Sequence, residues 1–181
     1  MALKSSIFRL TLQLADLDRQ LYRDFPLTVA RHPSETDARM MLRILAFALH
    51  ADDQLAFGRG ISTDDEPDLW LRRLDGTIET WIELGTPDPD RLRKACGRAE
   101  RVLLYAYGDR AIPVWLKKHD TALSRLDRLR ILQVKDADMQ ALAGILAPGM
   151  NLQCTIAEGE LLFVSDRHSF AVTPVEQQLN A

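Results

Sequence analysis

The stretch from Leu69 to Gly85, LWLRRLDGTIETWIELG, decides the fold because two apolar runs flank a turn pair within it. Asp75-Gly76 is a common dipeptide at the turn of a β-hairpin. The runs Leu69–Leu74 and Ile78–Leu84 are therefore predicted to pair as antiparallel strands. The neighbouring elements can be placed relative to this hairpin.

Helix and strand patterns lie on both sides of the hairpin. A helix beginning at Ser34 is apolar around most of its circumference, which is typical of a buried central helix. The run after the second helix is continuously apolar, as in a buried parallel strand. The predicted elements are a helix at 34–51, a strand at 55–61, the hairpin, a helix at 90–101 and a strand at 102–107. The order α-β-β-β-α-β over 34–107 predicts an α/β domain with a mixed sheet.

Both ends of the chain add β-structure to this core. Apolar residues alternate at 7–14 and 22–31, which predicts an antiparallel pair within residues 1–33. A β-meander is predicted over 150–173. Between core and meander, the sequence predicts helices near 113–119 and 139–146 and a strand at 129–134. We expect one domain over residues 1–181.

Composition excludes several classes of protein. The chain has 181 residues, a net charge of −3 and a pI near 5.8, so a domain-wide basic surface for nucleic acid is absent. No apolar run is long enough for a transmembrane helix, and the N-terminus lacks the pattern of a signal peptide. Cys96 and Cys154 form no metal or disulfide motif. We expect a reduced, cytoplasmic protein with no membrane contact.

Three carboxylates occupy positions that are suited to binding a metal ion. Glu35 opens the first helix, Asp68 begins a strand, and Glu83 lies near the end of the next strand. Carboxylates at the ends of adjacent hairpin strands can come together and bind Mg²⁺, or Mn²⁺ as an alternative. Asp65 and Glu66 are possible replacements for Asp68. Such an ion can activate water and stabilise charge on a phosphodiester.

Each carboxylate also has a structural interpretation. The helix dipole favours any acid at the position of Glu35, and the acidic turn before Asp68 is compatible with a solvated loop. Glu83 lies between two apolar residues, and a buried carboxylate needs partners. Strand alternation nevertheless places it on the face opposite to both neighbours, which can be wet.

A row of cations follows Glu83. Arg91, Lys94, Arg98 and Arg101 recur at spacings of three, four and three on the predicted helix 90–101. The row is a candidate for holding nucleic-acid phosphates beside the metal. A solvated face that balances nearby acids explains the same spacing.

The arrangement resembles the PD-(D/E)XK nuclease superfamily. Pro67-Asp68 is similar to the PD element, and Ile82-Glu83-Leu84 to the start of the (D/E)XK element. Gly85 stands where that pattern has lysine. The resemblance implies that Glu35, Asp68 and Glu83 are metal ligands, with Glu83 and Lys94 as the catalytic pair if Lys94 supplies the missing ammonium group.

A closer resemblance, to the YaeQ family of small bacterial proteins, covers nearly the whole chain. The segments that carry it are 2–4, 15–19, 30–36, 39–43, 64–67, 81–85 and 94–96. The resemblance implies a PD-(D/E)XK-like fold with a modified motif and suggests a link to transcription.

Three functions remain open. The first is a Mg²⁺-dependent nuclease or phosphodiesterase. The second is a nuclease-fold module without catalysis that binds nucleic acid or a protein, which Gly85 and the acidic pI favour. The third is a metal-binding regulator that contacts a protein through the N-terminal hairpin or the meander. Fold alone does not choose among them.

Overall fold

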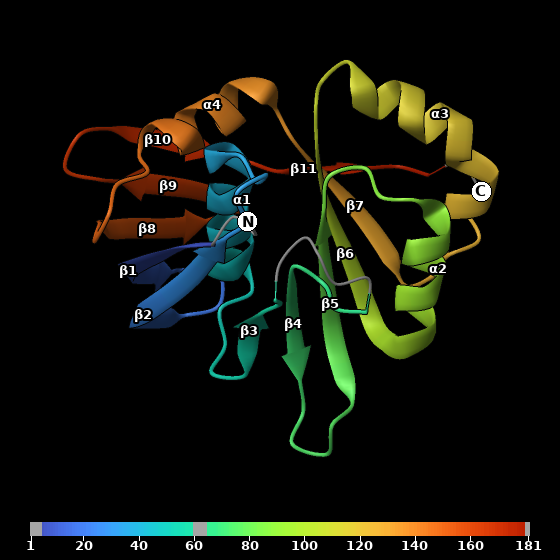
Figure 1. The fold of residues 1–181 in the computed structure, drawn as a ribbon, viewed down its shortest axis with the longest axis horizontal. Helices are drawn as coiled ribbons and strands as arrows, with labels where there is room; N and C mark the ends of the chain where they lie inside the picture. Colours follow the sequence, from blue (N-terminus) through green and yellow to red (C-terminus); the bar gives the residue numbers. More distant parts are fainter. Residues whose placement is uncertain (1–4, 60–64, 180–181) are drawn as a thin grey trace.

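The computed structural model describes residues 5–59 and 65–179, which form two β-sheets and four helices (Figure 1). The helices are α1 (Asp37–Leu49), α2 (Pro89–Arg98), α3 (Ala111–Leu123) and α4 (Asp136–Gly144). The strands are β1 (Ser6–Asp16), β2 (Leu21–Arg31), β3 (Leu55–Phe57), β4 (Leu69–Arg72), β5 (Ile78–Leu84), β6 (Ala99–Tyr107), β7 (Leu129–Val134), β8 (Asn151–Ala157), β9 (Glu160–Val164), β10 (Ser169–Val172) and β11 (Val175–Gln177).

Sheet A joins the two ends of the chain in the order β10-β9-β8-β1-β2. β1 pairs antiparallel with β2, as the alternating patterns predict, and parallel with β8, where Thr11 is opposite Asn151. Sheet B has the order β11-β7-β6-β5-β4-β3, with β5, β6 and β7 parallel. The prediction of one mixed sheet is wrong in this respect, because β1, β2, β8, β9 and β10 form a sheet of their own.

Helix α1 lies between the two sheets (Figure 1). Every residue from Met40 to Ala48 is buried, because the inner faces of both sheets pack against it. The predicted central helix is therefore confirmed, but it begins later than expected. Thr36 is the N-cap and accepts the N–H of Arg39, whereas the Ser34 hydroxyl lies 2.6 Å from Nδ1 of His32 in the preceding turn.

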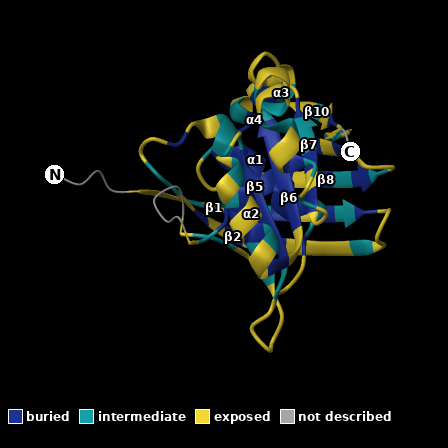
Figure 2. Cartoon of the chain, turned by 90° about the vertical axis from the view of Figure 1, so that its right-hand side faces the viewer, coloured by how far each residue is buried: buried dark blue, intermediate teal, exposed yellow. Residues whose placement is uncertain are grey.

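Helices α2 and α3 cover the other face of sheet B. Figure 2 shows β5 and β6 as buried strands behind the partly exposed α2. The predicted order α-β-β-β-α-β is present as α1-β3-β4-β5-α2-β6. Several boundaries differ. α2 ends at Arg98 and β6 begins at Ala99, and β4 ends at Arg72 instead of Leu74. The strand predicted at 55–61 ends at Phe57, with residues 60 and 61 outside the described part. The mixed α/β class is confirmed, and in the described residues no helix has the length and apolarity to cross a bilayer.

Candidate functional site

Strand pairing brings two of the predicted carboxylates together. Leu69 pairs with Ile82, so continuing the β4–β5 register by one residue places Asp68 opposite Glu83. Both are almost fully buried, at 6% and 3% exposure, and both line a small cleft of about 250 Å³. The expectation that the ends of the hairpin carry neighbouring carboxylates is met in this geometry.

Arginine 39 connects Asp68 to the third carboxylate. Its Nη1 donates to Oε1 of Glu35 at 2.9 Å, and its Nη2 lies 2.8 Å from Oδ1 of Asp68. The backbone N–H of Leu84 also donates to Asp68, at 3.0 Å. Glu35 and Asp68 thus share one guanidinium group, which lies between them.

Arginine 43 holds Glu35 from the other side. Its Nε and Nη2 donate to the two carboxylate oxygens at 3.0 and 2.6 Å, and Nη2 also reaches the Ala30 carbonyl. This ion pair is bidentate and fully buried. A partial signal for both arginines was in the sequence: Arg39 and Arg43 are one turn apart on the same face of the helix, and Glu35 precedes Arg39 by the same spacing just before the N-cap.

Glu83 has a different set of partners. Its Oε1 accepts from Nε1 of Trp81 at 2.7 Å and from Nε of Arg91 at 2.9 Å, while Nη2 of Arg91 donates to the carbonyl of Glu66. Arg91 lies on the first turns of α2, which follows β5 directly. The cation that reaches Glu83 is therefore Arg91.

These six side chains form what we call the carboxylate–arginine cluster: Glu35, Asp68, Glu83, Arg39, Arg43 and Arg91. Three carboxylates and three guanidinium groups leave no net charge when all are ionised. Mg²⁺ prefers carboxylate oxygens that are free to coordinate it, whereas each carboxylate here already accepts from arginine. Across residues 5–59 and 65–179 no three His, Cys, Asp or Glu side chains are arranged to hold a metal ion. The donor set has the right chemistry for Mg²⁺, but its pairing does not fit the ion.

The remaining predicted site residues are dispersed. Lys94 makes no hydrogen bond or ion pair with the described residues and lines a larger cleft beside α2. Arg98 donates to the Asp65 carbonyl and lies over the Trp81 ring at 5.1 Å. The carboxylate of Glu66 pairs with Arg59, at 3.3 Å. The metal roles predicted for Asp65 and Glu66 stay predictions.

The structure corrects the predicted place of Arg101. It lies on β6, and its guanidinium donates to the Thr80 hydroxyl from the sheet face that carries Tyr105, opposite to α2. The prediction that all four cations share one helix is therefore wrong, because α2 ends before Ala99 pairs with Ile78.

Gly85, where the resemblance would place a lysine, lies at a turn that favours glycine. Its φ of +92° lies in the left-handed region, where a side chain is strained. Its N–H donates to the carbonyl of Tyr105 at 2.9 Å, so the chain turns out of β5 at this point. A side chain at this position would strain the backbone, and the positive charge beside Glu83 comes from Arg91 on the next helix.

Burial raises the pKa of both Asp68 and Glu83, and the charge of Asp68 adds to the effect on Glu83. Arg39 and Arg91 act in the opposite direction but do not cancel it. A raised pKa means that the folded protein holds the proton more tightly than the unfolded chain does. This tighter binding of the proton stabilises the folded state. The stabilisation is complete below the ordinary pKa values of 3.8 for Asp68 and 4.5 for Glu83, and it is lost as the pH rises through the raised pKa values.

We therefore expect Glu83→Gln to gain stability relative to the wild type as pH rises from about 4 to 7, because glutamine does not ionise. Urea unfolding at a series of pH values measures this difference. Glu100→Gln, at an exposed position near the start of β6, is the matched control for the exchange of a carboxylate for an amide. The raised pKa of Glu83 is contradicted if the stability difference between Glu83→Gln and the wild type does not change with pH. It is also contradicted if the variant gains stability relative to the wild type as the pH falls.

Comparisons with known proteins give a consistent result. Residues 1–174 match the family model described as YaeQ protein. The chain is 41% identical over 172 residues to the "Uncharacterized protein YaeQ" of Escherichia coli (strain K12) and to that of Salmonella typhi, covering 95% of each chain. It is also similar to the crystal structure of the YaeQ protein from Xanthomonas axonopodis pv. citri, with 44% identity, a TM-score of 0.91, and coverage of 97% of this chain and 99% of the other. The YaeQ protein from Pseudomonas syringae has the same TM-score at 39% identity and 96% coverage of both chains.

Proposed function

The chain belongs to the YaeQ family, and on that premise we propose that it is a PD-(D/E)XK-like module without hydrolytic activity that binds nucleic acid. The observation that carries the proposal is the pairing of each predicted metal ligand with arginine. A nuclease of this type needs its carboxylates free for a divalent cation. In the carboxylate–arginine cluster, the guanidinium groups of Arg39 and Arg91 occupy the place of that cation.

The cleft beside α2 is the proposed binding surface. It has a volume of about 810 Å³ and is lined by Trp81, Lys94 and Arg98, among others. Neither Lys94 nor Arg98 has a carboxylate partner in the described part of the chain, so both charges are available for phosphates. Acids at the start of α2 serve the helix itself: Asp88 accepts the N–H of Asp90, whose carboxylate pairs with Arg93.

We expect the protein to bind a fluorescently labelled single-stranded oligonucleotide with an affinity that falls as the salt concentration rises. Two phosphate contacts correspond to a slope of about −1.4 in log K against log salt concentration. Lys94→Ala should weaken binding and reduce the slope by about 0.7. Fluorescence anisotropy measures both quantities. Arg167→Ala, an exposed arginine between β9 and β10, is the control and should behave as the wild type. Equal binding by wild type and Lys94→Ala would exclude this surface.

Calorimetric titration with Mg²⁺ and then Mn²⁺ tests the absence of a metal site. We expect no saturable heat for the wild type. We expect saturable binding once Arg39→Met and Arg91→Met are combined, because Asp68 and Glu83 then lose two compensating charges. Thermal melting must show that the double variant is folded, and Arg91→Met alone provides a milder version. Wild-type binding that disappears in Glu83→Ala contradicts the proposal.

One observation favours the alternative, a Mg²⁺-dependent nuclease. Asp68 and Glu83 lie opposite each other at the ends of adjacent strands, as the superfamily pattern requires. Lys94 does not contact them, so Arg91 would have to stabilise the developing charge. Cleavage of a labelled strand by wild type, lost in Glu83→Gln, would establish this alternative. The cytoplasmic location and a protein partner stay predictions.

A further inference from the structure

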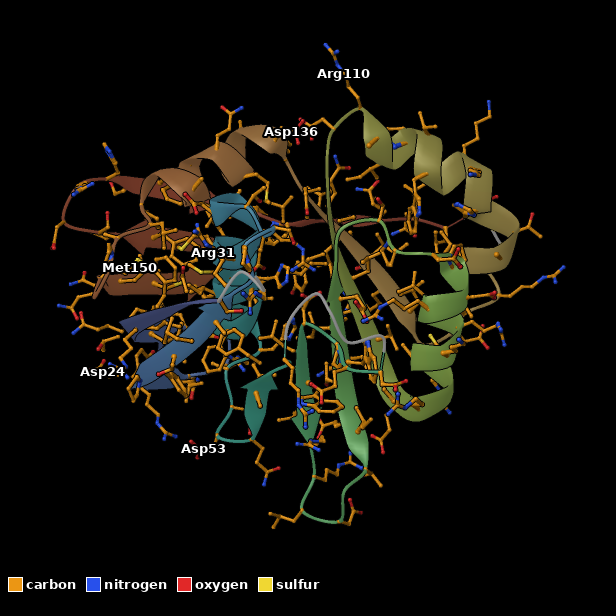
Figure 3. All side chains as sticks on the ribbon, viewed as in Figure 1. Asp24, Arg31, Asp53, Arg110, Asp136 and Met150 are labelled. Carbon is orange, nitrogen blue, oxygen red and sulfur yellow. The ribbon has the colours of Figure 1, made fainter. Side chains whose placement is uncertain are left out.

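We propose that a second cleft, on the face of sheet B opposite to α2, binds a small oxyanion of the phosphate type. The cleft has a volume of about 220 Å³ and lies where the end of α1 meets β5 and β6. The loop that leaves α1 here carries Asp53, which is labelled in Figure 3. The inference does not depend on the proposed function, which concerns the other face of the sheet.

Arginine 101 provides the positive charge. Its Nε and Nη2 lie 3.3 and 2.8 Å from the Thr80 hydroxyl, which is a neutral acceptor. No carboxylate in the described residues pairs with it, in contrast to the three arginines of the carboxylate–arginine cluster. Thr80 is buried and accepts from Arg101, so its own hydroxyl proton remains available to donate.

His50 provides a second donor. Its Nε2 lies 2.6 Å from the phenol oxygen of Tyr105, which is only 1% exposed. The phenol has no other partner in the described residues, so its proton must go to Nε2; otherwise a buried donor would be left without an acceptor. Nδ1 of His50 therefore carries the ring proton. Nothing described accepts it, which leaves an N–H available at the cleft.

Of the arginines around His50, Arg19 pairs with Asp16 and Arg130 with Glu176, whereas Arg101 has no carboxylate partner in the described residues and is the charge that can bind an anion. Burial lowers the pKa of His50 to about 3, and the charges that act with it come from Arg101, Arg19 and Arg130. The ring is therefore neutral at physiological pH and donates without needing protonation. Arg19 also covers the helix end, with N–H groups 3.1 and 3.3 Å from the carbonyls of Ala51 and Ala48. The negative end of the α1 dipole is thus capped.

The two acids in the cleft have partners of their own. Oδ1 of Asp52 accepts the N–H of Gln54, and the carboxylate of Glu79 lies 3.4 Å from Nε of Arg73. The donors come from three places: the guanidinium of Arg101 on β6, the hydroxyl of Thr80 on β5 and the imidazole of His50 at the C-cap of α1. A phosphate group offers three or more oxygens to donors that approach from different sides, whereas a carboxylate offers two in one plane. This arrangement favours phosphate over a carboxylate ligand.

Calorimetric titration of the whole protein with inorganic phosphate, at constant ionic strength, tests the proposal. We expect one equivalent to bind, with affinity at least about tenfold weaker in Arg101→Met because a charge-assisted contact is lost. Arg110→Met, an exposed arginine at the start of α3 labelled in Figure 3, should bind as the wild type does. Thr80→Val is the second variant in case Arg101→Met does not fold, and it should also weaken binding.

Two further readouts locate the site and identify the ligand class. In ¹⁵N-histidine spectra, phosphate should shift the Nδ1–H signal of His50 and leave that of His168, on the turn before β10, unchanged. Sulfate should compete, and acetate at the same concentration should not. The proposal is overturned if phosphate shows no saturable binding, or if the Arg101 and Thr80 variants bind it as tightly as the wild type does. It is also overturned if the His50 signal does not move, or if acetate competes as well as sulfate.

Discussion

Arg43→Met is expected to lower the free energy of unfolding by about 3–5 kcal/mol, because it leaves the buried carboxylate of Glu35 without its bidentate partner. Both side chains are almost completely inaccessible. Arg39 would remain on Glu35 but is shared with Asp68, so it cannot replace the lost contacts. For a chain of this length the melting temperature should fall by roughly 6–20 °C. Urea unfolding and thermal melting measure the two quantities.

A double-mutant cycle separates the ion pair from simple loss of packing. Glu35→Leu alone should also be strongly destabilising, whereas the combination with Arg43→Met should recover much of the loss, because both buried charges are then removed. Arg93→Met, at an exposed pair on α2, is the control and should cost no more than about 1 kcal/mol. Additive effects of the two buried changes would show that the pair is not a coupled unit.

Gly58→Ala should cost about 3 kcal/mol, which is large for the addition of one methyl group. A Cβ at this position would overlap with the backbone carbonyl oxygen of Pro67, and backbone atoms cannot move aside cheaply. The N–H of Gly58 donates to the carbonyl of Asp68 at 2.9 Å. The clash therefore displaces the segment that positions Asp68 opposite Glu83.

Two measurements test the prediction for Gly58→Ala. Denaturant unfolding gives the energetic cost, and the pH dependence attributed to Asp68 and Glu83 should weaken if the segment moves. Gly97→Ala in α2 is the matched control, since a Cβ there meets nothing within 4 Å. Replacing a helical glycine by alanine should stabilise by about 0.5–1 kcal/mol. A Gly58→Ala variant as stable as Gly97→Ala would contradict the described backbone approach.

The sequence predicted most elements because their patterns are local. The terminal pair, the hairpin at Asp75-Gly76 and the apolar strand β7 follow directly from alternation, turn chemistry and burial. The boundary at Arg98 was missed because the basic spacing continues through Arg101, although Gly97 stands one residue before the end of α2. β11 was missed because Val175–Gln177 is a short segment that becomes a strand only by pairing with β7.

The candidate site was predicted only in part for a similar reason. A carboxylate within an apolar strand or at the start of a helix can be recognised from the local sequence, and Glu35, Asp68 and Glu83 were found in this way. The contact of Arg39 with Asp68 could not be predicted in this way, because it joins residues 29 positions apart in the chain. Only the three-dimensional contact shows that these carboxylates bind guanidinium groups.

Parallel pairing of β1 with β8 has a consequence for the nascent chain. The hairpin of β1 and β2 is complete at Arg31, but its neighbour in the sheet is complete only at Ala157. At a synthesis rate of 5–20 residues per second, the unpaired edge of β1 waits for roughly 6–25 s on the ribosome. An unprotected strand edge can pair with other chains. The order of the strands thus leaves the early hairpin with one unpaired edge until β8 has been synthesised.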